Sequence, residues 1–198
     1  MNIEEKRNVE REKYEWLNKN SRNYGKSFHG KKFTEYLIEL NKQDSINSIV
    51  DIGTGRGEFC KWAAENLCNE VIGVDFVFES REKNKDNKIT YYKCFAHDLS
   101  LKDKSIDMLT SFDMLEHLVE DDIDIVFEEF FRVTKKYFLF TISHSDSKTH
   151  RKNVGSLHPT VKPREWWLEK IKKYGEINRV KVKNPRGFGI LVKLYNHE

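Results

Sequence analysis

The stretch that decides the fold is SIVDIGTGRGE, residues 48–58. In it a short apolar run ends at three alternating glycines, Gly53, Gly55 and Gly57, and a helical pattern follows over residues 59–67. Alternating glycines let the backbone turn sharply and let a ligand lie against it, because no Cβ atoms stand in the way. The stretch therefore predicts a strand, a ligand-binding turn and a helix.

On both sides of this turn, apolar runs alternate with helical patterns. The runs predict five strands, at residues 46–52, 71–74, 89–94, 106–112 and 137–142. Strands that alternate with helices, here 59–67 and 119–133, are typical of parallel βαβ units in an open sheet. The other patterns predict helices at 4–20, 28–40 and 163–173, and an antiparallel hairpin of 176–183 with 188–195.

The composition fits one folded domain. Of the 198 residues, 38% are hydrophobic and 13% are aromatic, and this aromatic content argues against disorder. No apolar run approaches the roughly 20 residues that span a bilayer. The charged segment 1–22 lacks the apolar stretch of a secretory signal, and the three cysteines form no disulfide or metal-binding pattern. We therefore expect a cytoplasmic protein with reduced thiols and no membrane association.

The net charge of +3 hides an uneven distribution along the chain. Residues 147–187 include twelve basic and three acidic residues, so this segment carries nine net positive charges and the remainder carries six net negative ones. Such a division predicts two different surfaces, an acidic body and a basic C-terminal part. The basic part favours an anionic partner.

Acidic residues near the strand ends narrow the choice of ligand. Asp51, Asp75, Asp98 and Asp113 lie at or just past the ends of four predicted parallel strands, whose carboxyl ends meet at one edge of the sheet. A dinucleotide fingerprint would need glycine where the chain has Glu58, and four carboxylates suit a pyrophosphate poorly. They suit a ligand with an amino group, ribose hydroxyls and a positive centre.

Four motifs in order resemble those of the class I S-adenosylmethionine-dependent methyltransferases. They are VDIGTGRGEF (50–59), VIGVDF (71–76), HDLSL (97–101) and SFDMLEHL (111–118). The resemblance implies a Rossmann-like, mostly parallel seven-stranded sheet of order 3-2-1-4-5-7-6 with an antiparallel last strand. Helices would cover both faces, after an N-terminal helical extension. The single domain would comprise N-terminal helices and a lid (1–44), a cofactor-binding core (45–142) and a substrate loop, helix and hairpin (143–198).

The same resemblance implies a set of cofactor-binding residues. Gly53, Gly55 and Asp51 would contact the methionine part, and Asp75 would bind the ribose. The adenine would lie among the side chains or amides of Phe76, Asp98 and Leu99. Phe112 and Asp113 on the fourth strand would line the cofactor. Apart from the resemblance, the polar loop 21–30 is a candidate lid over the cofactor, with Tyr24 as a candidate contact.

Histidines are the expected catalytic groups. Methyl transfer is an in-line displacement, so the protein has to align the acceptor and, for a hydroxyl, remove its proton. His117 lies just past the fourth strand, and a histidine base is suited to neutral pH; His158 is the second expected catalytic residue. The expected substrate-binding residues come from two polar segments and are Lys26, His29, His144 and Arg164.

We therefore expect transfer of a methyl group from S-adenosylmethionine to a hydroxyl of a small anionic or carbohydrate acceptor, such as a phosphorylated or nucleotide-linked sugar. Two alternatives stay open. Glu116, His117 and His158 are similar to the metal-binding set of small-RNA 2′-O-methyltransferases, which with the basic segment allows a metal-dependent RNA methyltransferase. A divalent metal and RNA are the less favoured expectations. A non-catalytic cofactor-binding subunit is the other alternative, and the sequence leaves the oligomeric state open.

Overall fold

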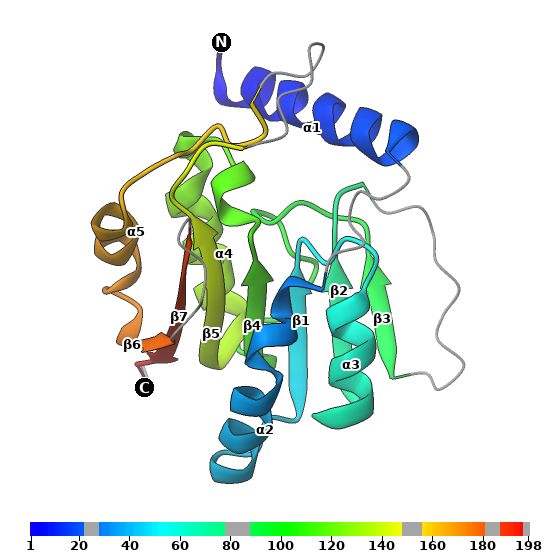
Figure 1. Ribbon diagram of the computed structural model, residues 1–198, viewed down its shortest axis with the longest axis vertical. Helices are drawn as coiled ribbons and strands as arrows, with labels where there is room; N and C mark the ends of the chain where they lie inside the picture. Colours follow the sequence, from blue (N-terminus) through cyan, green and yellow to red (C-terminus); the bar gives the residue numbers. More distant parts are fainter. Residues whose placement is uncertain (22–27, 78–87, 148–155, 181–186, 196–198) are drawn as a thin grey trace.

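In the computed structural model, the described residues are 1–21, 28–77, 88–147, 156–180 and 187–195 (Figure 1). They form one seven-stranded sheet of order β3-β2-β1-β4-β5-β7-β6, which confirms the predicted order. The strands are β1 Ser48–Ile52, β2 Glu70–Val74, β3 Ile89–Tyr92, β4 Ile106–Phe112, β5 Thr134–Ser143, β6 Gly175–Val180 and β7 Gly187–Leu194. Strands β1 to β5 pair in parallel, while β7 pairs antiparallel with both β5 and β6.

The helices follow the expected positions, with two differences at their starts. The α-helices are α1 Ile3–Asn20, α2 Thr34–Gln43, α3 Glu58–Asn66, α4 Ile123–Val133 and α5 Arg164–Ile171. The helix predicted over 28–40 begins as the 3₁₀ helix η1 (His29–Phe33), and the one over 119–133 begins as η3 (Glu120–Asp122). A third short 3₁₀ helix, η2, spans Leu115–His117. Short 3₁₀ turns are common at helix starts, and an apolar pattern does not distinguish them from α-helix.

Two apolar layers fill the faces of the sheet. On one face, α2 and α3 bury Leu37, Phe59 and Ala63 against β1, β2 and β4. On the other face, α4 and α5 bury Phe127 and Trp167 against the opposite side of the same strands and of β5 and β7. The prediction of helices on both faces is therefore confirmed. The division into 1–44, 45–142 and 143–198 stays a prediction.

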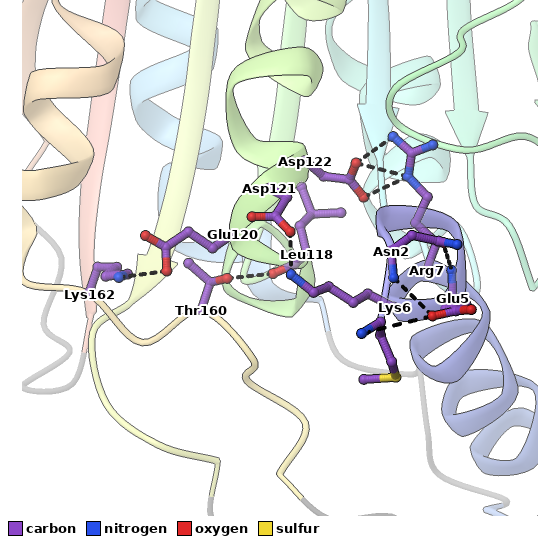
Figure 2. Close-up of polar contacts among 11 residues, drawn as sticks. Asn2, Glu5, Lys6, Arg7, Leu118, Glu120, Asp121, Asp122, Thr160 and Lys162 are labelled. Carbon is purple, nitrogen blue, oxygen red and sulfur yellow. Dashed lines mark hydrogen bonds and ion pairs between the residues drawn. The ribbon is translucent and has the colours of Figure 1, made fainter.

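Helix α1 lies across the carboxyl ends of the strands (Figure 1). Its side chain Arg7 donates to both carboxylate oxygens of Asp122, from Nε at 2.9 and 3.1 Å, just before α4 begins. Figure 2 shows this pair and, beside it, the more exposed ion pair of Lys6 with Asp121. The capping box of Asn2 and Glu5 starts the helix, with backbone-to-side-chain bonds of 2.9 Å in each direction. These contacts anchor α1 over the edge of the sheet where a ligand of this fold would bind.

No helix in the described part of the chain combines the length and apolar character needed to cross a membrane.

Candidate active site

The glycine turn joins β1 to α3. Gly53, Gly55 and Gly57 all have positive φ values, of 73°, 54° and 75°. At Gly53 the need for glycine is also steric, since a Cβ atom there would lie 2.4 Å from Cγ of Met114. The turn is held to the next strand, because the amides of Gly53 and Thr54 donate to the carbonyl oxygen of Val74 at 2.8 and 3.0 Å. The turn therefore presents bare backbone beside the end of β4.

Asp51 lies behind this turn and is almost fully buried, with 3% of its surface exposed. Thr110 Oγ1 donates to its carboxylate at 2.8 Å. Burial raises the pKa of Asp51 to about 7, although the hydrogen bonds of Thr110 and Thr54 lower it. A cationic amino group beside Asp51 would offset the cost of burying its charge. A buried acid of this kind fits the ammonium group of S-adenosylmethionine.

Asp75 follows β2 and faces the glycine turn. One of its carboxylate oxygens accepts from the Gly55 amide at 3.0 Å, and the other accepts from the Val77 amide at 3.0 Å. A carboxylate is an acceptor of the kind that ribose hydroxyls donate to. Together with the bare glycine turn and Asp51, this arrangement fits the cofactor that the motifs imply.

On the expected adenine side, three rings form a stack. Phe76 stacks on Phe95 at 5.7 Å between ring centroids, and Phe95 stacks on His97 at 5.3 Å. Asp98 is exposed, consistent with a group that could meet the adenine amine. The Leu99 amide, by contrast, donates to Glu129 Oε1 at 2.7 Å and is thus already engaged within the protein.

Phe112 lies in the core rather than in an open crevice. It is 9% exposed and stacks on Phe33 at 5.7 Å, while Phe59 meets it edge-on at 4.9 Å. Its role as a direct cofactor contact stays a prediction. The packing of Phe112 against Phe33 and Phe59 fixes the end of β4, where Asp113 follows.

That residue, Asp113, ends β4 in the left-handed conformation, with a φ of 51°. Its carboxylate Oδ2 lies 2.7 Å from Nδ1 of His29, which comes from the start of η1. Burial alone would raise the pKa of Asp113, but the hydrogen bond and charge of His29, with help from Thr141, lower it below its ordinary value. The sequence assigned these two residues to different ligands, whereas the fold places them together.

His117 and His158 lie beside a buried carboxylate. Their rings meet edge-on at 4.7 Å, and ligand atoms of both and of Glu116 lie within 4.8 Å of one another. Glu116 Oε1 accepts from the Ser143 amide at 3.1 Å, while its buried Oε2 has no hydrogen-bond partner among the described residues. Burial, and then the charge of Asp113, raises the pKa of Glu116 to about 8.

Both histidines use Nδ1 for a backbone contact. His117 Nδ1 lies 2.6 Å from the Leu157 carbonyl oxygen, and His158 Nδ1 lies 2.8 Å from that of Ser145. A carbonyl oxygen can only accept, so each Nδ1 carries a proton, and in the neutral form of either ring the lone pair is on Nε2. Burial, and then the charge of His158, lowers the pKa of His117 to about 4. His117 is therefore neutral at pH 7 and a weak base, and its assignment as catalytic base stays a prediction.

Tyr14 on α1 is a site residue that the sequence did not reveal. Its hydroxyl donates to the Leu157 carbonyl oxygen at 2.9 Å and contacts His117 Nδ1, and its ring meets Phe76 edge-on at 5.8 Å. In the sequence, a tyrosine within a helical pattern does not indicate which distant residues it will contact. Tyr14 thus connects His117, which follows β4, with Phe76 on the expected adenine side.

The remaining candidates divide into placed and unplaced residues. His144 is exposed and stacks on Phe188 at 6.3 Å, with Arg164 over the same ring at 5.8 Å from its guanidinium carbon. Phe188 pairs with Ile142 across β5 and β7, so this group lies at the carboxyl end of β5. Tyr24 and Lys26 fall outside the described residues.

Comparison with known proteins gives one family match over part of the chain and several similar folds. A family model described as a methyltransferase domain matches residues 50–140. One similar solved structure is Burkholderia thailandensis 1,6-didemethyltoxoflavin-N1-methyltransferase with bound S-adenosylhomocysteine. Its TM-score is 0.68 at 14% identity, over 99% of this chain and 92% of that one. Another is an S-adenosylmethionine-dependent methyltransferase from Mesorhizobium loti. Its TM-score is 0.61 at 17% identity, over 85% of this chain and 99% of that one. A search of curated proteins finds no match.

Proposed function

We propose that this chain, a class I S-adenosylmethionine-dependent methyltransferase, methylates a hydroxyl oxygen of a small anionic or carbohydrate acceptor. S-adenosylmethionine supplies an electrophilic methyl group on a sulfonium sulfur. The glycine turn, Asp51 and Asp75 would hold it at the ends of β1 and β2, for the reasons given above. The observation that carries the choice of acceptor is the group formed by Arg164, Phe188 and His144.

This group combines the two features that bind a charged sugar. The Phe188 ring contacts both His144 and Arg164, at 6.3 and 5.8 Å, and aromatic rings are groups that pack against sugar rings. The guanidinium of Arg164 suits a phosphate, and its buried Nε has no hydrogen-bond partner among the described residues. A phosphorylated or nucleotide-linked sugar would satisfy both.

The acceptor can be tested with matched panels. The protein is incubated with S-adenosylmethionine and sugar phosphates, nucleotide sugars, their uncharged sugars or simple amines. S-adenosylhomocysteine release and the methylated product are measured by mass spectrometry. We expect methyl ethers from the anionic sugars.

Arg164→Ala should raise the KM of the anionic acceptors about tenfold or more, because a charge-assisted bond is lost. Lys170→Ala, in the same helix α5 but paired with Asp124, is the matched control and should change KM less than twofold. Methylation of the amines alone, or equal effects of the two variants, would contradict the proposal.

A second candidate function is supported by the cluster of Glu116, His117 and His158. Two Nε2 lone pairs and a buried carboxylate oxygen are a donor set for a borderline divalent metal, and backbone acceptors for Nδ1 are the usual outer contacts of metal-binding histidines. Such an ion would bind acceptor hydroxyls. With the basic segment 147–187, it would fit transfer to a ribose 2′-hydroxyl of RNA.

Metal content and salt dependence separate the two candidates. For the RNA candidate, isothermal titration with Zn²⁺ or Mn²⁺ should show binding that Glu116→Gln weakens, and a chelator should abolish turnover. Binding to a labelled single-stranded RNA should fall steeply with salt, because phosphate contacts release counterions. Turnover of a sugar phosphate that a chelator leaves unchanged would favour the first candidate.

We also propose that the reaction takes place in the cytoplasm. Support comes from the cysteines, since Cys60, Cys68 and Cys94 form no disulfide and the first two are buried. Cell fractionation of the tagged protein tests this location.

A further inference from the structure

The pair formed by His29 and Asp113 joins two distant parts of the chain. His29 begins η1, and Asp113 follows β4; their Nδ1 and Oδ2 atoms are 2.7 Å apart. The side chain of His29 is 47% exposed and that of Asp113 is 20% exposed. A partly buried carboxylate thus holds a histidine whose side chain is still about half exposed.

Both members of the pair are fixed by their neighbours. The Asp113 amide donates to the Thr141 carbonyl oxygen and lies 2.9 Å from both this oxygen and the Thr141 hydroxyl, which holds its left-handed turn. Next to His29, Gly30 packs so closely that a Cβ atom would lie 2.7 Å from Phe59 and 2.9 Å from Phe112. This close packing of Gly30 holds the neighbouring His29 beside the rings of Phe59 and Phe112.

The pair also lies next to the glycine turn. Met114, the residue after Asp113, packs directly on Gly53. A Cβ atom on Gly53 would lie only 2.4 Å from Cγ of Met114. The methionine end of the cofactor is expected at this turn. An acceptor oxygen that approaches the methyl group from outside the sheet would come past the end of β4, where the pair lies.

We propose that His29 is the general base of the reaction and that Asp113 is its positioning residue. The carboxylate accepts Nδ1–H, which leaves the lone pair on Nε2 for the acceptor hydroxyl. As the acceptor oxygen forms its bond to the methyl carbon, the carbon–sulfur bond breaks and its electron pair stays on sulfur. The hydroxyl proton passes to Nε2. This inference rests on the proposed hydroxyl acceptor, because an amine that is already neutral needs no such base.

The geometry can be tested without any acceptor. In protein labelled with ¹⁵N-histidine and saturated with S-adenosylhomocysteine, long-range ¹H–¹⁵N spectra identify which ring nitrogen carries the proton. The His29 signals, assigned by their loss in His29→Ala, should show a protonated Nδ1 and a bare Nε2 at pH 8. Asp113→Asn should shift the balance toward the Nε2–H form. A His29 that is already in the Nε2–H form, or that ignores Asp113→Asn, overturns the proposal.

Turnover of the best hydroxyl acceptor from the panel tests the chemistry. His29→Ala should lower kcat by about 10²- to 10³-fold, and added imidazole should restore part of it. The variant should bind S-adenosylhomocysteine within threefold of the native protein. Asp113→Asn should lower kcat about tenfold or more with little change in KM. Lys31→Ala, an exposed neighbour in η1, is the matched control and should leave kcat unchanged.

The two proposals fail in different ways. If hydroxyl acceptors are turned over equally well by His29→Ala, or if imidazole restores nothing, His29 is not the base, although the hydroxyl acceptor stands. If the panel yields only N-methylated products, the hydroxyl acceptor fails, and the ¹⁵N spectra still report whether the pair holds His29 as described.

Discussion

The turns that end β1 and β4 lie side by side but are built in opposite ways. The β1 turn consists of backbone, with Gly53, Gly55 and Gly57 in left-handed conformations and with a carboxylate from the next strand against it. The β4 turn carries side chains, and each of them meets a partner from a distant segment. The first turn is a local device for one ligand. The second becomes a site only when the chain has folded.

The largest contrast should appear in cofactor affinity. Asp75→Ala at the β1 turn should weaken S-adenosylhomocysteine binding about 100-fold in isothermal titration, because it removes the proposed acceptor of two ribose hydroxyls. His29→Ala at the β4 turn should change the same affinity less than threefold. Equal losses in the two variants would remove the distinction between the turns.

The two turns should also differ in how much a substitution lowers the free energy of unfolding. Gly53→Ala should lower the free energy of unfolding by about 2–3 kcal/mol, because the new Cβ meets Met114 and a φ of 73° strains alanine. Asp113→Gly at the β4 turn removes a strained side chain and should cost less than about 1 kcal/mol. Urea unfolding measures both. A larger loss at Asp113 than at Gly53 would show that the β4 turn is the structural one.

The attachment of helix α1 beside the β4 turn should depend on one ion pair, that of Arg7 with Asp122. Arg7→Ala leaves the buried Asp122 carboxylate unpaired and should cost about 2 kcal/mol. Lys6→Ala removes the exposed pair with Asp121 beside it (Figure 2) and should cost about 0.5 kcal/mol or less. Urea unfolding monitored at Trp16 of α1 compares them. Similar losses would mean that α1 is not held by the Arg7 pair.

The smallest effect concerns pH. The folded-state pKa of Asp51 is about 7, above the ordinary value of 3.8, so its neutral form is favoured by folding. The stability it contributes is full below pH 3.8 and is lost as the pH rises toward 7. Between pH 5 and 6, the native protein should lose about 1 kcal/mol more than Asp51→Asn, which stays neutral. Parallel stability curves of the two proteins would show that burial does not raise this pKa.

The sequence predicted the fold well because its signals are local. Apolar runs of strand length, a glycine turn after Ile52 and acids at strand ends each depend on a few neighbouring residues. The sheet order was implied by the resemblance of four motifs to the class I methyltransferases, and the structure confirms it. The sequence was less accurate where the pattern is ambiguous, as at η1, where helical spacing conceals the 3₁₀ turn that sets His29. It placed the Leu99 amide near the adenine, and no local pattern indicates that this amide donates to Glu129, which is thirty residues away.

What the sequence alone determined is the set of strands and the acidic, glycine-lined end of β1, since these follow from periodicity and from backbone that only glycine allows; the order of the strands came from the resemblance of its motifs to a known family. The tertiary structure decided which side chains work together at β4. Burial makes His117 a neutral, weak base, and long-range packing brings His29 to Asp113 and Tyr14 to Leu157. Protonation depends on surroundings, and those surroundings are assembled from segments up to 143 residues apart in the chain.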